Sequence, residues 1–156
     1  MNPRLMVLFI CLLFSCGRGI VYDNYMPVKD SWDKTAEYRF DFDITDKSVP
    51  YDITIQIRNN NTYPYQNIWL LCEELHGDNI VDKDTIEYML ADDFGKWKGN
   101  GITLFQSHIT LKDNYFFPDT GKFAIKIRHG MRNDFLRGIE DIGLLVALKK
   151  ETNKNF

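Results

Sequence analysis

Two pairs of adjacent carboxylates, Asp92-Asp93 and Glu140-Asp141, are the residues of this chain best suited by type to acid–base chemistry. Glycosidases use two carboxylates placed across a cleft. Adjacent carboxylates in a loop usually point into solvent, and nothing in their spacing indicates a cleft. The sequence also lacks a Gly-x-Ser-x-Gly nucleophile motif, a phosphate-binding P-loop and a His-Glu-x-x-His zinc motif. We therefore expect no enzymatic activity and no cofactor.

Cys16 stands at the end of an apolar N-terminal segment, in a pattern that favours modification of its thiol. Arg4 is followed by ten apolar residues, 5–14, a run too short to cross a bilayer. This is the layout of a secretory signal peptide. The ending Leu13-Phe14-Ser15-Cys16 resembles the bacterial lipobox, in which the preceding peptide is removed and the cysteine receives acyl chains such as palmitate. We predict a signal peptide over 1–15 and lipidation of Cys16. The alternatives are an ordinary signal peptide that contains a cysteine and an N-terminal core strand.

The other metal- and thiol-type residues show no functional pattern. Cys72 lies in an apolar run, 68–72, where a buried hydrophobic role is expected rather than a catalytic thiol. The three histidines, His76, His108 and His129, are far apart, and no Cys-x-x-Cys occurs. No metal site is predicted.

The charge of the chain argues against nucleic acid as a partner. The whole sequence has a net charge of −3, and removal of 1–15 takes away one basic residue, leaving −4. Phosphate backbones are bound by clustered Lys and Arg, and no such cluster occurs. The length after cleavage suits a single domain.

Alternation of apolar and polar residues with period two dominates the chain. It occurs over 37–44, 51–58 and 122–128, and predicts half-buried strands of antiparallel sheets. The segment 45–50 is expected to join the first two strands as a hairpin-like loop. Segment 67–75 is apolar on both faces and predicts a central strand.

Further apolar segments complete an all-β chain. Strands are also expected over 80–90, 102–111 and 142–148, with turns at 77–79 and 118–121. The stretch 131–141 is the one place where a short helical turn is expected. Seven or eight closely spaced strands predict a single antiparallel β-sandwich, either jelly-roll or immunoglobulin-like, over residues 32–150. Residues 16–31 are predicted to be a lipidated N-terminus and tether with an edge strand at 20–22, and 151–156 a polar tail.

Three segments together carry a family resemblance. They are 58–67 (RNNNTYPYQN), 90–101 (LADDFGKWKGNG) and 127–132 (IRHGMR), the last followed by 138–143 (GIEDIG). With the lipobox-like ending and Tyr22-Asp23 before them, their order resembles the GldH family of gliding-motility lipoproteins. The resemblance covers nearly the whole chain after the signal peptide.

The resemblance implies a function without catalysis. It implies a lipid-anchored protein of the cell envelope, a structural or assembly component of the bacterial gliding apparatus and its associated secretion machinery. Other envelope proteins are its implied partners, and no catalytic residue is implied. The family also occurs in bacteria that do not glide.

The loops that carry these motifs are the candidate contact surface, because loops at one end of a sandwich cluster. They span 59–67, 92–101 and 129–138. The candidate partner-binding residues are Tyr63, Tyr65, Asp92, Trp97 and Arg132. Trp97, between glycines, either faces a partner or plugs the open end of the sandwich. Asp92 is a candidate salt partner, and Arg132 either pairs with an acidic neighbour or holds a ligand.

A carbohydrate-binding sandwich is the alternative function, because such folds often bind sugars on exposed aromatics such as Trp69, Trp97 or Tyr65. Two of these aromatics lying coplanar on one exposed face would favour it.

The residues after Cys16 bear on localisation. Gly17, rather than Asp, after the cysteine favours the outer membrane by analogy with known sorting rules. The absence of an acidic cluster over 17–19 favours its periplasmic face.

Overall fold

The computed structural model describes residues 19–149, so the predicted signal peptide, Cys16 and the tail 151–156 lie outside the described residues. Ten strands and no helix occur within this range. The strands are β1 (Ile20–Pro27), β2 (Trp32–Asp33), β3 (Tyr38–Ile44), β4 (Tyr51–Asn60), β5 (Asn67–His76), β6 (Asn79–Met89), β7 (Leu104–Tyr115), β8 (Gly121–His129), β9 (Phe135–Leu136) and β10 (Ile139–Leu148).

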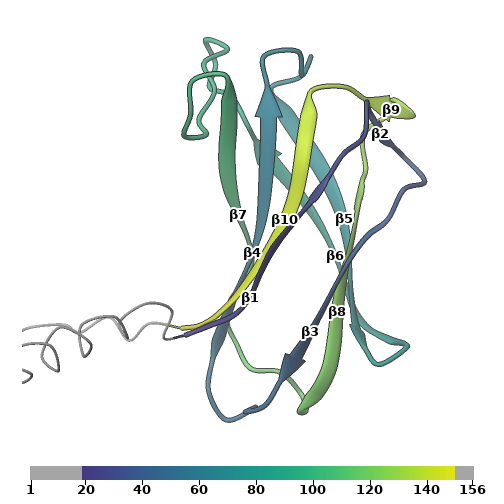
Figure 1. Cartoon of the computed structure of the whole chain (residues 1–156), viewed down its shortest axis with the longest axis vertical. Coiled ribbons are helices and arrows are strands. Elements are labelled where there is room, and N and C mark those ends of the chain that lie inside the picture. The colour runs from purple at the N-terminus through teal and green to yellow at the C-terminus, as the bar shows by residue number, and fades with distance from the viewer. Residues whose placement is uncertain (1–18, 150–156) are drawn as a thin grey trace, which may run out of the picture.

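Eight long strands form two four-stranded antiparallel sheets, with the order β1-β10-β4-β7 in one and β3-β8-β5-β6 in the other (Figure 1). The hairpin β5–β6 joins neighbours within one sheet, whereas the other connections between long strands cross to the opposite sheet. Counted one to eight along the chain, the long strands give the orders 1-8-3-6 and 2-7-4-5, which is the jelly-roll arrangement. The predicted antiparallel β-sandwich is confirmed, in its jelly-roll form.

The alternating residues of the strands meet between the sheets as the core. Ile53, Ile55 and Ile57 of β4 are completely buried, as are Phe40 of β3 and Ile127 of β8. The polar residues between them lie on the outer faces. Removal of these apolar side chains from water supplies the main stabilising free energy of the sandwich.

Two expectations about connections were wrong. The segment 45–50 is no hairpin loop, because β3 pairs with β8 whereas β4 pairs with β10 and β7. Alternation shows which side chains face a core, but it does not show which strand is the neighbour. The stretch 131–141 contains no helical turn: β9 pairs there with β2, and together they form a separate two-stranded ribbon.

The sandwich begins earlier than predicted. β1 pairs with β10 from Ile20 to Pro27, and the side chain of Trp32 is fully buried. Residues 20–31 therefore belong to the folded domain, and the predicted tether is too long. The central position of 67–75 is confirmed, since β5 lies between β8 and β6. Its outer face remains partly wet, because Trp69 is 38% exposed.

Strand pairing places the loops at two opposite ends of the molecule. At one end, Ile20 pairs with Ala147 and Leu148 with Tyr51, so the chain enters and leaves there (Figure 1). We call it the entry end; the segments 45–50, 77–78 and 116–120 lie there too. At the other end, called the loop end, lie the segments 28–37, 60–66, 90–103 and 130–138.

No helix among residues 19–149 is long and apolar enough to cross a membrane.

Candidate binding surface at the loop end

The structure brings the three motif-bearing loops together at the loop end. The N–H of Asn60 donates to the carbonyl of Gly138 (2.8 Å), which joins the first loop to the third. The indole N–H of Trp97 donates to Asn61 Oδ1 (2.9 Å), which joins the second loop to the first. Loops that lie far apart in the sequence thus form one surface, as expected for the end of a sandwich.

Tyr63 is a core residue rather than a surface residue. Its side chain is 3% exposed, and its hydroxyl donates to the carbonyl of Asn67 (2.8 Å). Burial raises the pKa of the hydroxyl far above its usual value. Gly138 packs so closely that an added Cβ would lie 2.2 Å from the Tyr63 nitrogen. Tyr63 therefore supports the loops from beneath, and its selection as a contact residue is corrected.

Trp97 closes the end of the sandwich over Tyr63. Its ring centroid lies 6.3 Å from that of Tyr63 and 5.9 Å from that of Phe105. The ring is partly buried against the core, and Trp97 forms an isolated β-bridge with Ala91. Of the two roles considered for Trp97, this geometry is that of the plug.

Asp92 shapes a turn and forms no ion pair among the described residues. Its Oδ1 accepts the N–H groups of Phe94 (3.0 Å) and Lys96 (2.9 Å). The N–H of Gly95 donates to the Asp92 carbonyl (3.0 Å), and Gly95 has a φ of 79°, which glycine adopts at little cost. The structure thus gives Asp92 the role of a turn former.

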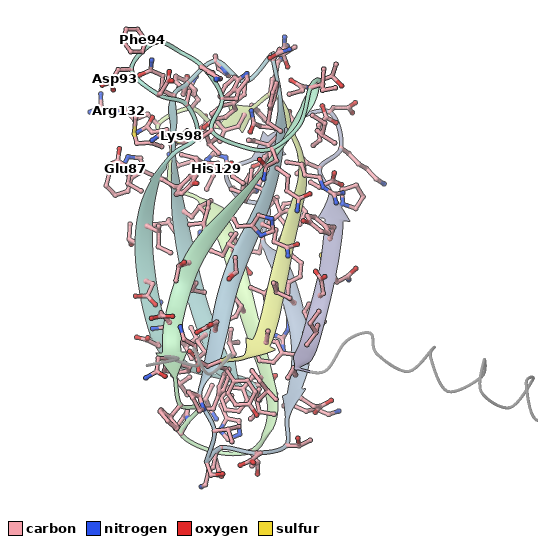
Figure 2. All side chains as sticks on the ribbon, turned by 90° about the vertical axis from the view of Figure 1, so that its left-hand side faces the viewer. Glu87, Asp93, Phe94, Lys98, His129 and Arg132 are labelled. Carbon is pink, nitrogen blue, oxygen red and sulfur yellow. The ribbon has the colours of Figure 1, made fainter. Side chains whose placement is uncertain are left out.

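Phe94 stands at the tip of this turn and is 97% exposed. Figure 2 shows it at the extremity of the loop end, beside Asp93. Ile102, in the same connection between β6 and β7, is 89% exposed. Sequence reasoning did not select Phe94. The signal that marked it was the pair Asp92 and Gly95, a turn former and a glycine on either side of an aromatic residue.

Arg132 and Tyr65 line a pocket of about 330 Å³ that lies over β5 and the segment after β8. The remaining lining residues are Asn67, Trp69, Gly130, Met131 and Asn133. The N–H of Gly130 donates to the Trp69 carbonyl (2.7 Å), so the chain after β8 continues beside the start of β5. Arg132 is exposed and makes no ion pair within residues 19–149.

Three of the four paired carboxylate residues have structural partners. Besides the turn held by Asp92, Glu140 accepts a hydrogen bond from Asn60 Nδ2, and Asp141 lies 3.6 Å from Arg58 Nη1. No group of three or more His, Cys, Asp or Glu side chains in the described range is placed to hold a metal ion. Cys72 is buried, and burial raises the pKa of its thiol to about 12, so the thiolate needed for nucleophilic attack is scarce.

The sequence model of the GldH lipoprotein family matches residues 20–146. The chain belongs to this family. The protein named gliding motility lipoprotein GldH in Flavobacterium johnsoniae is 30% identical over 156 residues, covering 95% of this chain and 97% of the relative. A gliding motility lipoprotein GldH homolog of Christiangramia forsetii is 34% identical over 148 residues, covering 89% and 91%. The family resemblance drawn from the three motif segments is confirmed, and the protein is a gliding-motility lipoprotein.

Similarity to solved structures is weak. The structure of infectious bursal disease virus, Gx strain, gives a TM-score of 0.33 at 13% identity, covering 85% of this chain and 33% of the viral one. Dimeric latent PorU from Porphyromonas gingivalis gives 0.32 at 7% identity, covering 84% and 13%. At these scores neither similarity bears on function.

Proposed function

We propose that this lipoprotein is a non-enzymatic assembly component of a gliding-motility apparatus and its associated secretion machinery. Acyl chains on Cys16 hold it on the periplasmic face of the outer membrane, and its loop end binds another envelope protein. The observation that carries the proposal is the opposite placement of the chain entry and the loop end.

The short link to Cys16 supports this orientation. Gly17, Arg18 and Gly19 separate Cys16 from β1, and four extended residues span at most about 14 Å. The entry end therefore stays near the bilayer surface. The loop end is one strand length farther out, and the 12 residues of β7 correspond to about 40 Å.

The exposure of Phe94 supports the proposal that the loop end binds a protein partner. A fully exposed aromatic on a turn fixed by hydrogen bonds loses little conformational freedom when it enters a partner's pocket. Buried aromatic anchors of this kind carry much of the binding free energy of protein interfaces. Ile102 adds apolar surface to the same connection.

Co-purification from native cells tests the proposal, with Phe94→Ser compared with Phe116→Ser. Phe116 is a matched control, because it is 50% exposed and follows β7 at the entry end. After crosslinking, Phe94→Ser is expected to recover the partner at least about tenfold less well, since a hot-spot aromatic contributes roughly 2 kcal/mol or more. Phe116→Ser is expected to recover it normally, and both variants to melt like the wild type.

The proposal is wrong if the Phe94→Ser variant melts normally and still recovers every envelope protein that the wild type recovers. An equal loss of partner recovery in the Phe94→Ser and Phe116→Ser variants would also contradict it, because the loop end would then have no special role.

A further inference from the structure

The pocket beside Arg132 is lined by aromatic and polar groups. This lining suits a different kind of ligand from the protein partner proposed to contact Phe94. Two aromatic rings, two side-chain amides and one guanidinium surround it, with Met131 and Gly130 completing the lining. We propose that this pocket binds a sugar unit that carries a carboxylate, such as a uronate of an acidic polysaccharide. The proposal is independent of the contact proposed for Phe94.

The aromatic part of the lining comes from one face of one chain segment. Asn67 and Trp69 occupy alternate positions at the start of β5, so they share a face of the strand, and Tyr65 lies two residues before the strand begins. Trp69 is 38% exposed, so its indole is open to a ligand. The C–H groups of a pyranose ring are apolar and pack on aromatic faces, while its hydroxyl groups remain available for hydrogen bonds.

The polar part of the lining is partly preorganised. The Asn67 amide donates to Glu87 Oε1 (2.6 Å), which fixes the orientation of that side chain. Asn133 supplies a second amide at the pocket. The indole N–H of Trp69 donates to no group in the part of the chain that the structure describes, and it is a donor suited to a sugar hydroxyl.

Arg132 accounts for the preference for a carboxylate. Its guanidinium presents donors in a fork that matches the two oxygens of a carboxylate, and no ion pair occupies it among residues 19–149. Figure 2 shows Arg132 and Glu87 on the same side of the loop end. The Glu87 carboxylate accepts a hydrogen bond from Asn67 and forms no ion pair with Arg132, so the guanidinium stays available to an acidic ligand.

The backbone around the pocket is held firmly enough to maintain its shape. The Trp69 N–H donates to Met131 Sδ (3.3 Å), and the Gly130 N–H to the Trp69 carbonyl (2.7 Å). An added Cβ at Gly130 would lie 3.3–3.4 Å from Leu71 and Trp69, so the two segments already pack closely. A preformed pocket binds its ligand without a large ordering cost.

Titration of the purified mature lipoprotein in detergent tests the proposal by calorimetry and tryptophan fluorescence. The probes are trisaccharides of galacturonate, glucuronate and mannuronate, each compared with its neutral counterpart. We expect at least one uronate to bind about tenfold or more tightly than its neutral counterpart. Trp69→Ala is expected to abolish binding, and Arg132→Gln to remove the difference between the charged and neutral sugars. Phe116→Ala, an exposed aromatic at the entry end, is the control and is expected to bind like the wild type.

Several results would overturn the proposal. They are no binding to any probe, equal binding of charged and neutral sugars by the wild type, and unchanged binding by Trp69→Ala. If no sugar binds and Trp69→Ala loses partner recovery in the separate co-purification from native cells, the pocket belongs to a protein interface instead. The assay uses purified protein without a partner, so its failure leaves the proposed assembly role unaffected.

Discussion

Some residues at the loop end stabilise the end of the sandwich, whereas others hold an aromatic side chain in solvent. Trp97 and Tyr63 pack against each other and keep the end of the sandwich closed. Asp92 uses its carboxylate to bind two backbone N–H groups, and the turn that it holds presents Phe94 to solvent. The aromatic residue that sequence reasoning favoured is thus partly buried, whereas the fully exposed one lies three positions earlier.

Replacement of Trp97 by alanine is expected to destabilise the domain by about 2–3 kcal/mol. A buried Trp→Ala change costs roughly 3–5 kcal/mol, and Trp97 is only partly buried. Trp97→Phe is expected to cost less, because it keeps the ring contacts and loses the hydrogen bond to Asn61. Urea unfolding of the three proteins measures the difference. Equal stability of Trp97→Ala and wild type would show that the ring does not close the core.

Glu74 is a buried carboxyl between the sheets. It is 3% exposed; its Oε1 accepts the Tyr115 hydroxyl (3.0 Å), and its Oε2 has no hydrogen-bond partner among the described residues. Burial raises the pKa of Glu74 above its ordinary value, although Tyr115 and Lys112 act in the opposite direction. Asp82 and Asp84 add to the increase.

The raised pKa makes Glu74 a destabilising charge at neutral pH. The folded protein holds the proton more tightly than the unfolded chain, so this group stabilises the fold fully below the unfolded pKa of about 4.3. That contribution is lost as the pH rises through the folded pKa. Glu74→Gln is therefore expected to have a larger free energy of unfolding than wild type at pH 7. This difference is expected to narrow as the pH falls through the raised folded pKa of Glu74. Urea unfolding from pH 4 to 8 checks this, and a gap independent of pH would contradict it.

At the scale of elements, side chains close both open edges of the sandwich. Lys112 of β7 pairs with Asp82 and with Asp84 (2.7 Å) of β6, which joins the two sheets along one edge. These two carboxylates outweigh the effect of burial and raise the pKa of Lys112. Along the other edge, Tyr22 of β1 packs on Phe40 and Phe42 of β3. Edge strands that engage each other through side chains are less available for pairing with other chains.

The contact between the first and third loops depends on Gly138. Its φ is 81°, and an added Cβ would lie 2.2 Å from the nitrogen and 2.6 Å from the Cα of Tyr63. Gly138→Ala is expected to cost more than about 3 kcal/mol, because backbone strain and a backbone clash add together. Gly77→Ala is the matched control, since its φ is 61° and nothing lies within 4 Å of an added Cβ.

The free energy of unfolding of the Gly77→Ala control is expected to fall by only about 1–2 kcal/mol, which is the cost of a left-handed conformation in a non-glycine residue. Urea unfolding of the two variants separates strain from clash. An equal loss at the two positions would show that the loops yield to the added atom, and the close packing of Gly138 on Tyr63 would then have little energetic weight.

At the scale of the whole molecule, the proposed function gives the two ends of the sandwich different roles. The entry end receives the chain a few residues after Cys16, while the loop end carries Phe94 and the pocket beside Arg132. The long strands of the two sheets run from one end of the described sandwich to the other. Such a molecule is suited to hold a contact surface at a set height above a membrane.

The anchoring of the molecule is predicted to depend on Cys16 alone. Wild-type protein is expected to enter the detergent phase on phase separation, because several acyl chains on one residue bind firmly to membranes. Cys16→Ala is expected to remain in the aqueous phase with an unchanged melting temperature, since the folded strands begin at Ile20. Equal recovery of both proteins in the aqueous phase would contradict lipidation.

The positions of several strands, the fold class and the family could be predicted from the sequence alone. The strands over 37–44, 51–58, 67–75 and 122–128, the sandwich class and the family follow from local patterns, because alternation and turn residues act within a few positions of the chain. The tertiary structure alone decided the jelly-roll pairing, the burial of Tyr63 and the pocket shared by Tyr65, Trp69 and Arg132. Those features join residues distant in the chain, and the packing of two sheets, rather than any local preference, selects which of them meet.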